Sequence, residues 1–137
     1  MRVTLDLNVV LDVLLARQDS LECSEVMSLA RSGAIEAVFP AHGLSTIYYL
    51  SRKVMNDHEV RDAIRAISKL AKIIDLSEPV WKRALDSPMA DFEDAIVAET
   101  AVAVDADFIV TRNVKDFFDS PIPAVTARAF MESVFRA

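Results

Sequence analysis

The sequence predicts an α/β fold: a parallel sheet of four to five short strands sandwiched between helices. Short apolar runs bounded by turn residues alternate with longer segments of helical periodicity. Strands and helices that alternate in this way form βαβ units, whose helices cover both faces of the sheet. The 137 residues contain only two glycines and five prolines, which leaves little room for linkers. We therefore expect one domain over residues 1–137.

The first half of the chain is predicted to hold two strands and three helices. In order, these are a strand over residues 2–6, helices over 9–16 and 21–31, a strand over 34–39 and an aromatic-rich helix over 43–53. Asn8 is the expected N-cap of the first helix, and Gly33 stands where a C′ glycine would end the second. The first helix is apolar on nearly every side, which is typical of a helix that is buried or forms part of an interface.

The second half continues the alternation. We expect a helix over residues 58–71, a strand over 72–76, helices over 78–86 and 91–104, a strand over 108–111, a short strand near Val125 and a closing helix over 127–135. The helix over 58–71 is the clearest of these, because its apolar residues recur at helical spacing.

Composition limits the classes of function. The formal net charge of −6 argues against broad, tight binding of nucleic acid, which requires a basic surface. A cluster of metal-holding carboxylates would, however, account for several negative charges. The single cysteine, Cys23, cannot form an internal disulfide, and no apolar run is long enough to span a bilayer. The first residues do not resemble a signal peptide, so we expect a cytoplasmic protein.

Polar side chains are predicted to gather at one edge of the sheet. In a parallel sheet the carboxyl ends of the strands and the amino ends of the following helices share an edge, where ligands bind. Asp6 and Asn8 follow the first strand, and Asp116 follows the fourth. The other polar residues expected there are Asp12, Ser45, Thr46, Asp91, Glu93, Asp94, Thr111, Arg112 and Asn113.

Each acid also has an ordinary structural explanation. Asp91 would serve as an N-cap, Glu93 and Asp94 would favour a helix N-terminus, and Asp116 would be a surface loop acid. If Asp6, Asp94 and Asp116 lay ~5 Å apart, however, each pair would repel by roughly 3 kcal/mol at an effective dielectric constant near 20. Such a group needs raised pKa values or a bound cation. Oxygen ligands without Cys or His favour Mg²⁺ or Mn²⁺ over zinc.

Four segments resemble a known family. LDLNVVLDVLL (residues 5–15), LSTIYYLSRK (44–53), DFEDAIVAETA (91–101) and ADFIVTRNVKDFFDSPIPAVTARAF (106–130) resemble PIN-domain proteins, and more narrowly VapC-like toxins of type II toxin–antitoxin systems. The resemblance runs nearly end to end in the same order. It implies a parallel-sheet α/β sandwich and an Mg²⁺- or Mn²⁺-dependent hydrolase that cleaves RNA internally.

The resemblance also implies roles for individual residues. Asp6, Asp94 and Asp116 would be the catalytic acids and, with Asp91, the metal ligands. Asn8, Asn113, Ser45 and Thr46 would support the metal shell, and we expect Arg112 to contact the substrate phosphate. A small antitoxin protein and a second copy of the chain are the expected partners, beside the RNA substrate.

The sequence departs from the family pattern at two positions. Ser45 and Thr46 stand where many members carry a glutamate, and Leu7 replaces a small hydroxylated residue after the first aspartate. Fewer anionic ligands predict weaker metal binding or loss of catalysis. A catalytically silent PIN-like module that binds RNA or protein is therefore the main alternative.

Three further alternatives have less sequence support. A phosphatase would need a second aspartate at position 8, where Asn8 stands. A receiver domain would need a phosphoacceptor aspartate after a central strand. A metal-free nuclease would need His42 and His58 to act together as acid and base.

Overall fold

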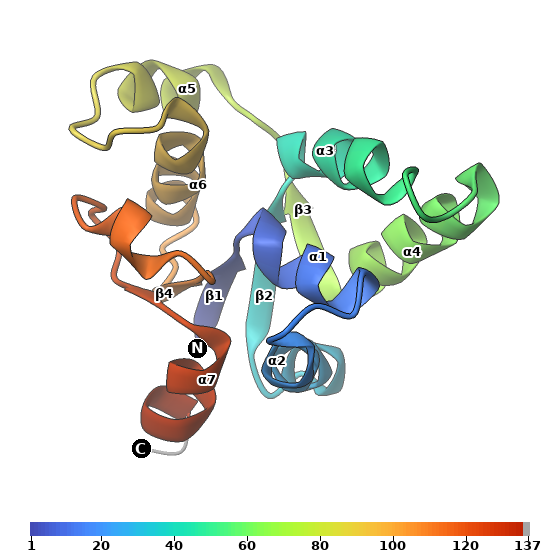
Figure 1. Cartoon of the computed structure of the whole chain (residues 1–137). Helices are drawn as coiled ribbons and strands as arrows, with labels where there is room; N and C mark the ends of the chain where they lie inside the picture. Colours follow the sequence, from blue (N-terminus) through green and yellow to red (C-terminus); the bar gives the residue numbers. More distant parts are fainter. Residues whose placement is uncertain (136–137) are drawn as a thin grey trace.

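The computed structural model describes residues 1–135 and contains a five-stranded parallel sheet with helices on both sides (Figure 1). The strands are β1 (Arg2–Leu5), β2 (Glu36–Pro40), β3 (Ala71–Ile74), β4 (Phe108–Val110) and β5 (Ala124–Val125). They lie in the order β3-β2-β1-β4-β5, and every neighbouring pair is parallel. The predicted α/β class with four to five short strands is confirmed.

The strand order changes direction between β1 and β4. Helices α1 (Leu7–Leu14) and α2 (Ser20–Ser32) connect β1 to β2, and α3 (His42–Ser51) and α4 (Asp57–Leu70) connect β2 to β3. Helices α5 (Glu78–Leu85) and α6 (Phe92–Ala103) then carry the chain past β1 to β4. A reversal of this kind leaves a crevice at the carboxyl ends of the two strands, where open α/β sheets bind their ligands.

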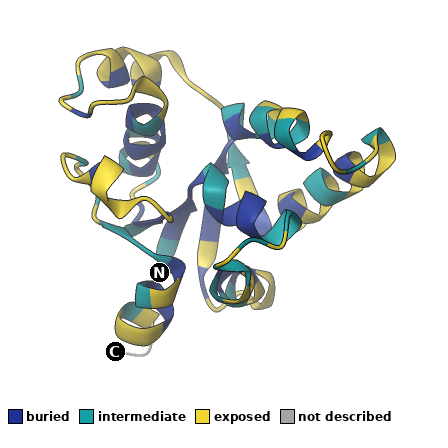
Figure 2. Cartoon of the chain, in the orientation of Figure 1, coloured by how far each residue is buried: buried dark blue, intermediate teal, exposed yellow. Residues whose placement is uncertain are grey.

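The core lies in two layers, one on each face of the sheet. One layer packs Val10 of α1, Phe39 of β2 and Phe130 near the C-terminus against β1, and the other packs α5 and α6 against β4. The neighbouring residues Ile109 and Val110 of β4 belong to different layers, because successive side chains of a strand point to opposite faces. Buried residues accordingly follow the strands and the inner faces of the helices (Figure 2).

The prediction that Asn8 caps the first helix is wrong. Asp6 is the N-cap: its backbone is extended and its side chain accepts a hydrogen bond from the N–H of Leu7. The helix therefore starts two residues earlier than expected, at Leu7 rather than Val9. Gly33 does end α2 in the left-handed region, at φ 82°, as predicted.

The predicted closing helix over 127–135 is divided. Helix α7 (Ala127–Ala129) continues as a wider π-helix over Phe130–Phe135. Residues five apart lie above one another in a π-helix, because its hydrogen bonds run from i to i+5. The rings of Phe130 and Phe135 are consequently stacked, with centroids 6.3 Å apart. The short 3₁₀ helix η1 (Val114–Phe117) links β4 to the region of β5. None of the helices within residues 1–135 has the length and apolar character needed to cross a bilayer.

Gly43→Ala should destabilise the fold. A Cβ added to Gly43 would lie 2.7 Å from Cζ of Phe39, a ring that is 1% exposed in the core. Overpacking of a buried site costs about 1–3 kcal/mol, and urea unfolding should show a loss in this range. Ser45→Ala, at an exposed position of the same helix, is the control and should change stability by about 0.5 kcal/mol or less. Equal stability of both variants would contradict the close packing of Gly43 against the Phe39 ring.

Candidate active site

Asp6 and Thr111 form the centre of the candidate site. They directly follow β1 and β4, the two strands that flank the reversal. The Asp6 N–H donates to the carbonyl oxygen of Val110 at 3.0 Å. One oxygen of the Asp6 carboxylate accepts from the Leu7 N–H at 2.8 Å, and the other accepts from Oγ1 of Thr111 at 2.8 Å. Asp6 is 7% exposed, so its carboxylate is held in place from both strands.

Burial raises the pKa of Asp6 above its usual value, although the hydrogen bonds from Thr111 and Leu7 oppose the shift. The two bonds occupy only part of the capacity of a carboxylate, which offers about four lone-pair positions. Asp6 can therefore act as a fixed ligand and still keep lone pairs for a cation.

Asn8 fastens the turn after β4 to the first turn of α1. Its Oδ1 accepts from the backbone N–H of Arg112 at 3.0 Å, and its Nδ2 donates to Oγ1 of Thr111 at 3.4 Å. The same Thr111 oxygen accepts from the N–H of Asn113 at 3.1 Å. Asn8 is thus not a helix cap but a clamp on residues 111–113, which lead into η1 and Asp116.

The predicted catalytic acids meet in one cleft. A hollow of about 240 Å³ is lined by residues of α1, α3 and α6, by Asp6 between β1 and α1, by Arg17 after α1, and by the segment after β4. Its lining residues are Asp6, Leu7, Asn8, Leu11, Arg17, Leu50, Glu93, Asp94, Arg112, Asn113 and Asp116. The structure therefore brings Asp6, Asp94 and Asp116 to the same hollow.

Asp94 carries the largest electrostatic perturbation in this cleft. It lies in the first turn of α6, and its N–H donates to Oδ1 of Asp91, the N-cap of that helix, at 2.9 Å. Partial burial, together with the negative charges of Asp6, Asp91, Asp116 and Glu93, raises the pKa of Asp94 to about 7. A carboxyl with a pKa near neutrality is typical of catalytic and metal-binding sites.

Three predicted site residues lie outside the lining of the cleft. Asp91 caps α6 rather than facing the hollow. Ser45 is exposed, and its hydroxyl donates to the carbonyl oxygen of His42 at 3.0 Å. Thr46 is half-buried on the same helix. Helix α3 instead lines the cleft through Leu50.

His42, the first residue of α3, was not expected near the acids. The carboxylates of Glu93 and Asp6 act on its charge, whereas burial lowers its pKa overall. Its Nδ1 is buried and finds no hydrogen-bond partner among the described residues. The sequence contains no signal for this placement, because it depends on the approach of α3 to α6 across the sheet edge.

Glu93 and Arg17 also line the cleft. Glu93 was expected at this sheet edge but was given no role in the site, and Arg17 was not expected there. Glu93 precedes Asp94 in the acidic turn, where it had only the role of favouring the helix N-terminus. Arg17 follows α1 and lies outside every motif. Its position is decided by how that helix ends.

The donors fit a hard divalent cation, although they do not enclose one as they stand. The cleft offers carboxylate oxygens from two sheet-edge segments and one helix, together with the amides of Asn8 and Asn113. These are the ligands that Mg²⁺ and Mn²⁺ prefer. Within residues 1–135, no three His, Cys, Asp or Glu side chains stand close enough together to hold an ion.

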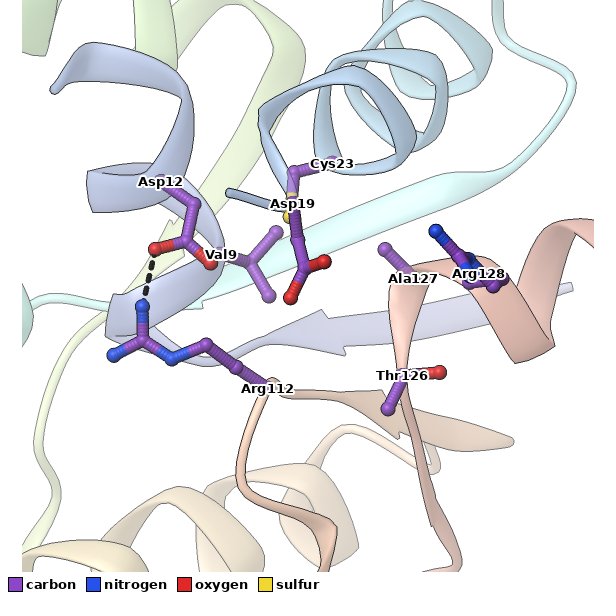
Figure 3. A pocket seen from close by; sticks show the side chains of 8 residues that line it. All are labelled: Val9, Asp12, Asp19, Cys23, Arg112, Thr126, Ala127 and Arg128. Atoms are coloured by element: carbon purple, nitrogen blue, oxygen red, sulfur yellow. Dashed lines mark hydrogen bonds and ion pairs between the residues drawn. The ribbon is translucent and has the colours of Figure 1, made fainter. Parts of the chain in front are cut away.

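Arg112 is bound to a buried carboxylate behind the cleft. Its guanidinium lies 2.5 Å from Oδ1 of Asp12 (Figure 3). Both residues also line a second hollow of about 210 Å³ between α1, α2 and the start of α7, where Cys23 lies. Burial raises the pKa of the Cys23 thiol to about 12, as expected of a core residue rather than a nucleophile.

Comparison with known proteins identifies the family of this chain. The sequence profile of the family described as PIN domain matches residues 2–115, most of the chain. The chain belongs to the PIN-domain family. No curated protein matches the sequence significantly.

Solved toxin–antitoxin complexes contain chains of the same fold. A chain of VapBC2 from Rickettsia felis, solved with a promoter DNA fragment, has a TM-score of 0.72 and 17% identity, over 92% of this chain and 98% of its own length. A chain of a toxin–antitoxin complex from Klebsiella pneumoniae has a TM-score of 0.70 and 21% identity, over 91% of this chain and 97% of its own length. A chain of VapBC-1 from nontypeable Haemophilus influenzae has a TM-score of 0.67 and 16% identity, over 93% of this chain and 99% of its own length.

Asp94→Asn should stabilise the metal-free protein at neutral pH. The folded state raises the pKa of Asp94 to about 7 from 3.8, so ionisation of this group costs folding free energy. The cost is absent below about pH 4, grows as the pH rises toward 7 and stays constant above it. The melting temperature of Asp94→Asn should therefore exceed that of wild type at pH 8 and match it near pH 4. Asp75→Asn, at an exposed acid, should show no such pH-dependent difference.

Proposed function

We propose that this protein is an Mg²⁺- or Mn²⁺-dependent endoribonuclease that hydrolyses RNA phosphodiester bonds. The convergence of Asp6, Asp94 and Asp116 on one cleft, with the pKa of Asp94 raised to about 7, is the main support. Membership of the PIN-domain family supports the same reaction.

In this proposal the residues of the cleft have different roles. A divalent cation held by Asp6, Asp94 and Asp116 would supply charge neutralisation and an acidified water. Asp6 is the rigid member, because Thr111 and Leu7 fix its two oxygens. Asp94 or Asp116 would in addition accept a proton from the attacking water.

The remaining residues position these groups and the substrate. Asp91 orients the first turn of α6 through its bond to the Asp94 N–H. Asn8 and Asn113 hold the turn that leads to Asp116. Arg112 contributes a cation at the same cleft and is proposed to contact the substrate phosphate.

We further propose that the protein is the toxin of a toxin–antitoxin pair and acts in the cytoplasm. The solved structures with the same fold come from toxin–antitoxin complexes, which supports a small antitoxin partner. An antitoxin segment that places a lysine or arginine among the carboxylates would block both substrate and metal. Exposed apolar side chains such as Phe118 (88% exposed) and Val54 (73%) support contact with a partner, including a second copy of the chain.

A catalytically silent module that binds RNA or protein is the second candidate. The positions of Ser45 and Thr46 favour it, because α3 provides no carboxylate to the cleft. Measurements of metal binding and cleavage separate the two candidates.

Mn²⁺ should raise the melting temperature of wild type and leave that of Asp94→Asn unchanged. An ion at ~100 times its dissociation constant adds ~2.7 kcal/mol, which is several degrees for a chain of this size. The same preparation, free of any partner, should cleave single-stranded RNA with Mn²⁺. Chelation with EDTA and the variant Asp6→Asn should both abolish cleavage. Wild type that neither shifts nor cleaves would favour the silent module.

Expression of the wild-type chain alone should arrest bacterial growth if it is a toxin. Asp94→Asn should restore growth, because it removes the proposed metal ligand. The control Asp75→Asn should remain as toxic as wild type. Equal growth with wild type and Asp94→Asn, at equal soluble protein levels, would argue against a nuclease toxin.

A further inference from the structure

Two arginines at the mouth of the acidic cleft share one buried carboxylate. Asp12, in the last turns of α1, is 0% exposed. Its Oδ1 lies 2.5 Å from the Arg112 guanidinium and 3.9 Å from that of Arg17. Both arginines line the cleft that contains Asp6, Asp94 and Asp116, and their side chains are 38% and 37% exposed. The cleft therefore has an acidic part, formed by Asp6, Asp94 and Asp116, and a cationic rim, formed by Arg17 and Arg112.

The end of α1 places Arg17 at this rim. The N–H of Ala16 donates to Val13 and the N–H of Arg17 donates to Asp12, the two bonds of a Schellman motif. This motif needs a left-handed residue, usually glycine, but here Ala16 occupies it at φ 49°. A non-glycine residue in this region is strained. The surrounding contacts therefore hold the chain in a conformation that returns Arg17 toward Asp12.

The rim has the chemistry of an anion site. The two guanidinium groups share a single carboxylate within 4 Å, that of Asp12, while Asp19 lines the neighbouring hollow with Arg112. Arginine presents five N–H donors, and the contacts with Asp12 use only part of this capacity. The planar guanidinium matches the oxygens of a phosphate, to which it can donate two parallel hydrogen bonds. Asp12 is fully buried, so it orients the arginines without facing the anion itself.

We propose that Arg17 and Arg112 together bind a backbone phosphate of the RNA strand beside the scissile bond, and that Asp12 is the positioning residue for both. The proposal rests on the proposed function in that it takes RNA as the ligand. It adds Arg17 and Asp12 to the site and gives the strand a second point of attachment. That attachment holds a phosphate diester at the carboxylates, which would otherwise repel it.

Binding of a fluorescein-labelled single-stranded RNA, followed by anisotropy in EDTA, tests the two arginines without cleavage. Arg17→Ala and Arg112→Ala should each weaken binding about tenfold. Each should also flatten the dependence of log affinity on log salt by about 0.7, the value for one phosphate contact on a single strand. Arg61→Ala removes the same charge from exposed α4 and should bind within about twofold of wild type. Affinities of Arg17→Ala equal to those of Arg61→Ala, or no binding by wild type, would overturn the proposal.

The positioning role of Asp12 is tested by a substitution for which positioning and simple charge predict opposite changes in RNA affinity. Asp12→Asn removes a negative charge, so simple electrostatics predicts tighter RNA binding. Positioning predicts weaker binding, because the guanidinium groups lose their anchor. Asp12→Glu should restore most of the affinity, since the neighbouring hollow of about 210 Å³ has room for one more methylene. Tighter binding by Asp12→Asn, with the fold intact by circular dichroism, would overturn the positioning role.

Cleavage assays with Mn²⁺ on the same variants separate this proposal from the nuclease proposal. If Arg17→Ala loses RNA affinity in EDTA but wild type does not cleave, the phosphate site stands and the nuclease fails. If wild type cleaves and Arg17→Ala and Arg112→Ala keep its KM, the phosphate site fails. A poly-glutamate peptide is the last probe: if Arg17→Ala weakens its binding but not that of RNA, the rim recognises an acidic protein segment, and the proposal is overturned.

Discussion

The buried carboxylate of Asp6 is the constraint on which the candidate site depends. It closes β1, begins α1 as its N-cap and accepts the hydroxyl of Thr111 from the end of β4. One side chain thereby joins two strands and a helix at the point where the strand order reverses. Because burying a carboxylate is costly unless its oxygens accept hydrogen bonds, these contacts and the local geometry support one another. Asn8 extends the same clamp to residues 111–113 and so to Asp116.

The cleft is built from groups that repel one another. The fold places Asp6, Glu93, Asp94 and Asp116 around one hollow in a chain that already carries a net charge of −6. Desolvation and like charge keep the pKa of Asp94 near 7. Stability is therefore lost at this cleft, as is common where a protein binds a ligand of opposite charge. The cations in the lining of this cleft are Arg17 and Arg112, which both lie against Asp12.

Local patterns predicted most of the fold because the strands and helices here follow ordinary rules. Helix α4 has the strongest apolar periodicity and lies within one residue of its predicted bounds. Gly33 ended α2 as expected. The error at Asn8 has a clear origin: Asp and Asn cap helices about equally well, so sequence could not rank Asp6 above it. The π-helical end over Phe130–Phe135 was missed because π-helices are rare and the prediction assumed α-helical periodicity.

The sequence by itself determined the α/β class, the family resemblance and the set of acids that lie near one sheet edge. It could do so because strand ends and helix starts are local features, and a parallel sheet brings them to a common edge. Only the tertiary structure decided which side chains face the cleft. It brought Glu93 and Arg17 into the lining, placed His42 near the acids, and left Asp91, Ser45 and Thr46 outside. These choices depend on helix rotation and on contacts such as that between Asp12 and Arg112, which form between residues far apart in the chain.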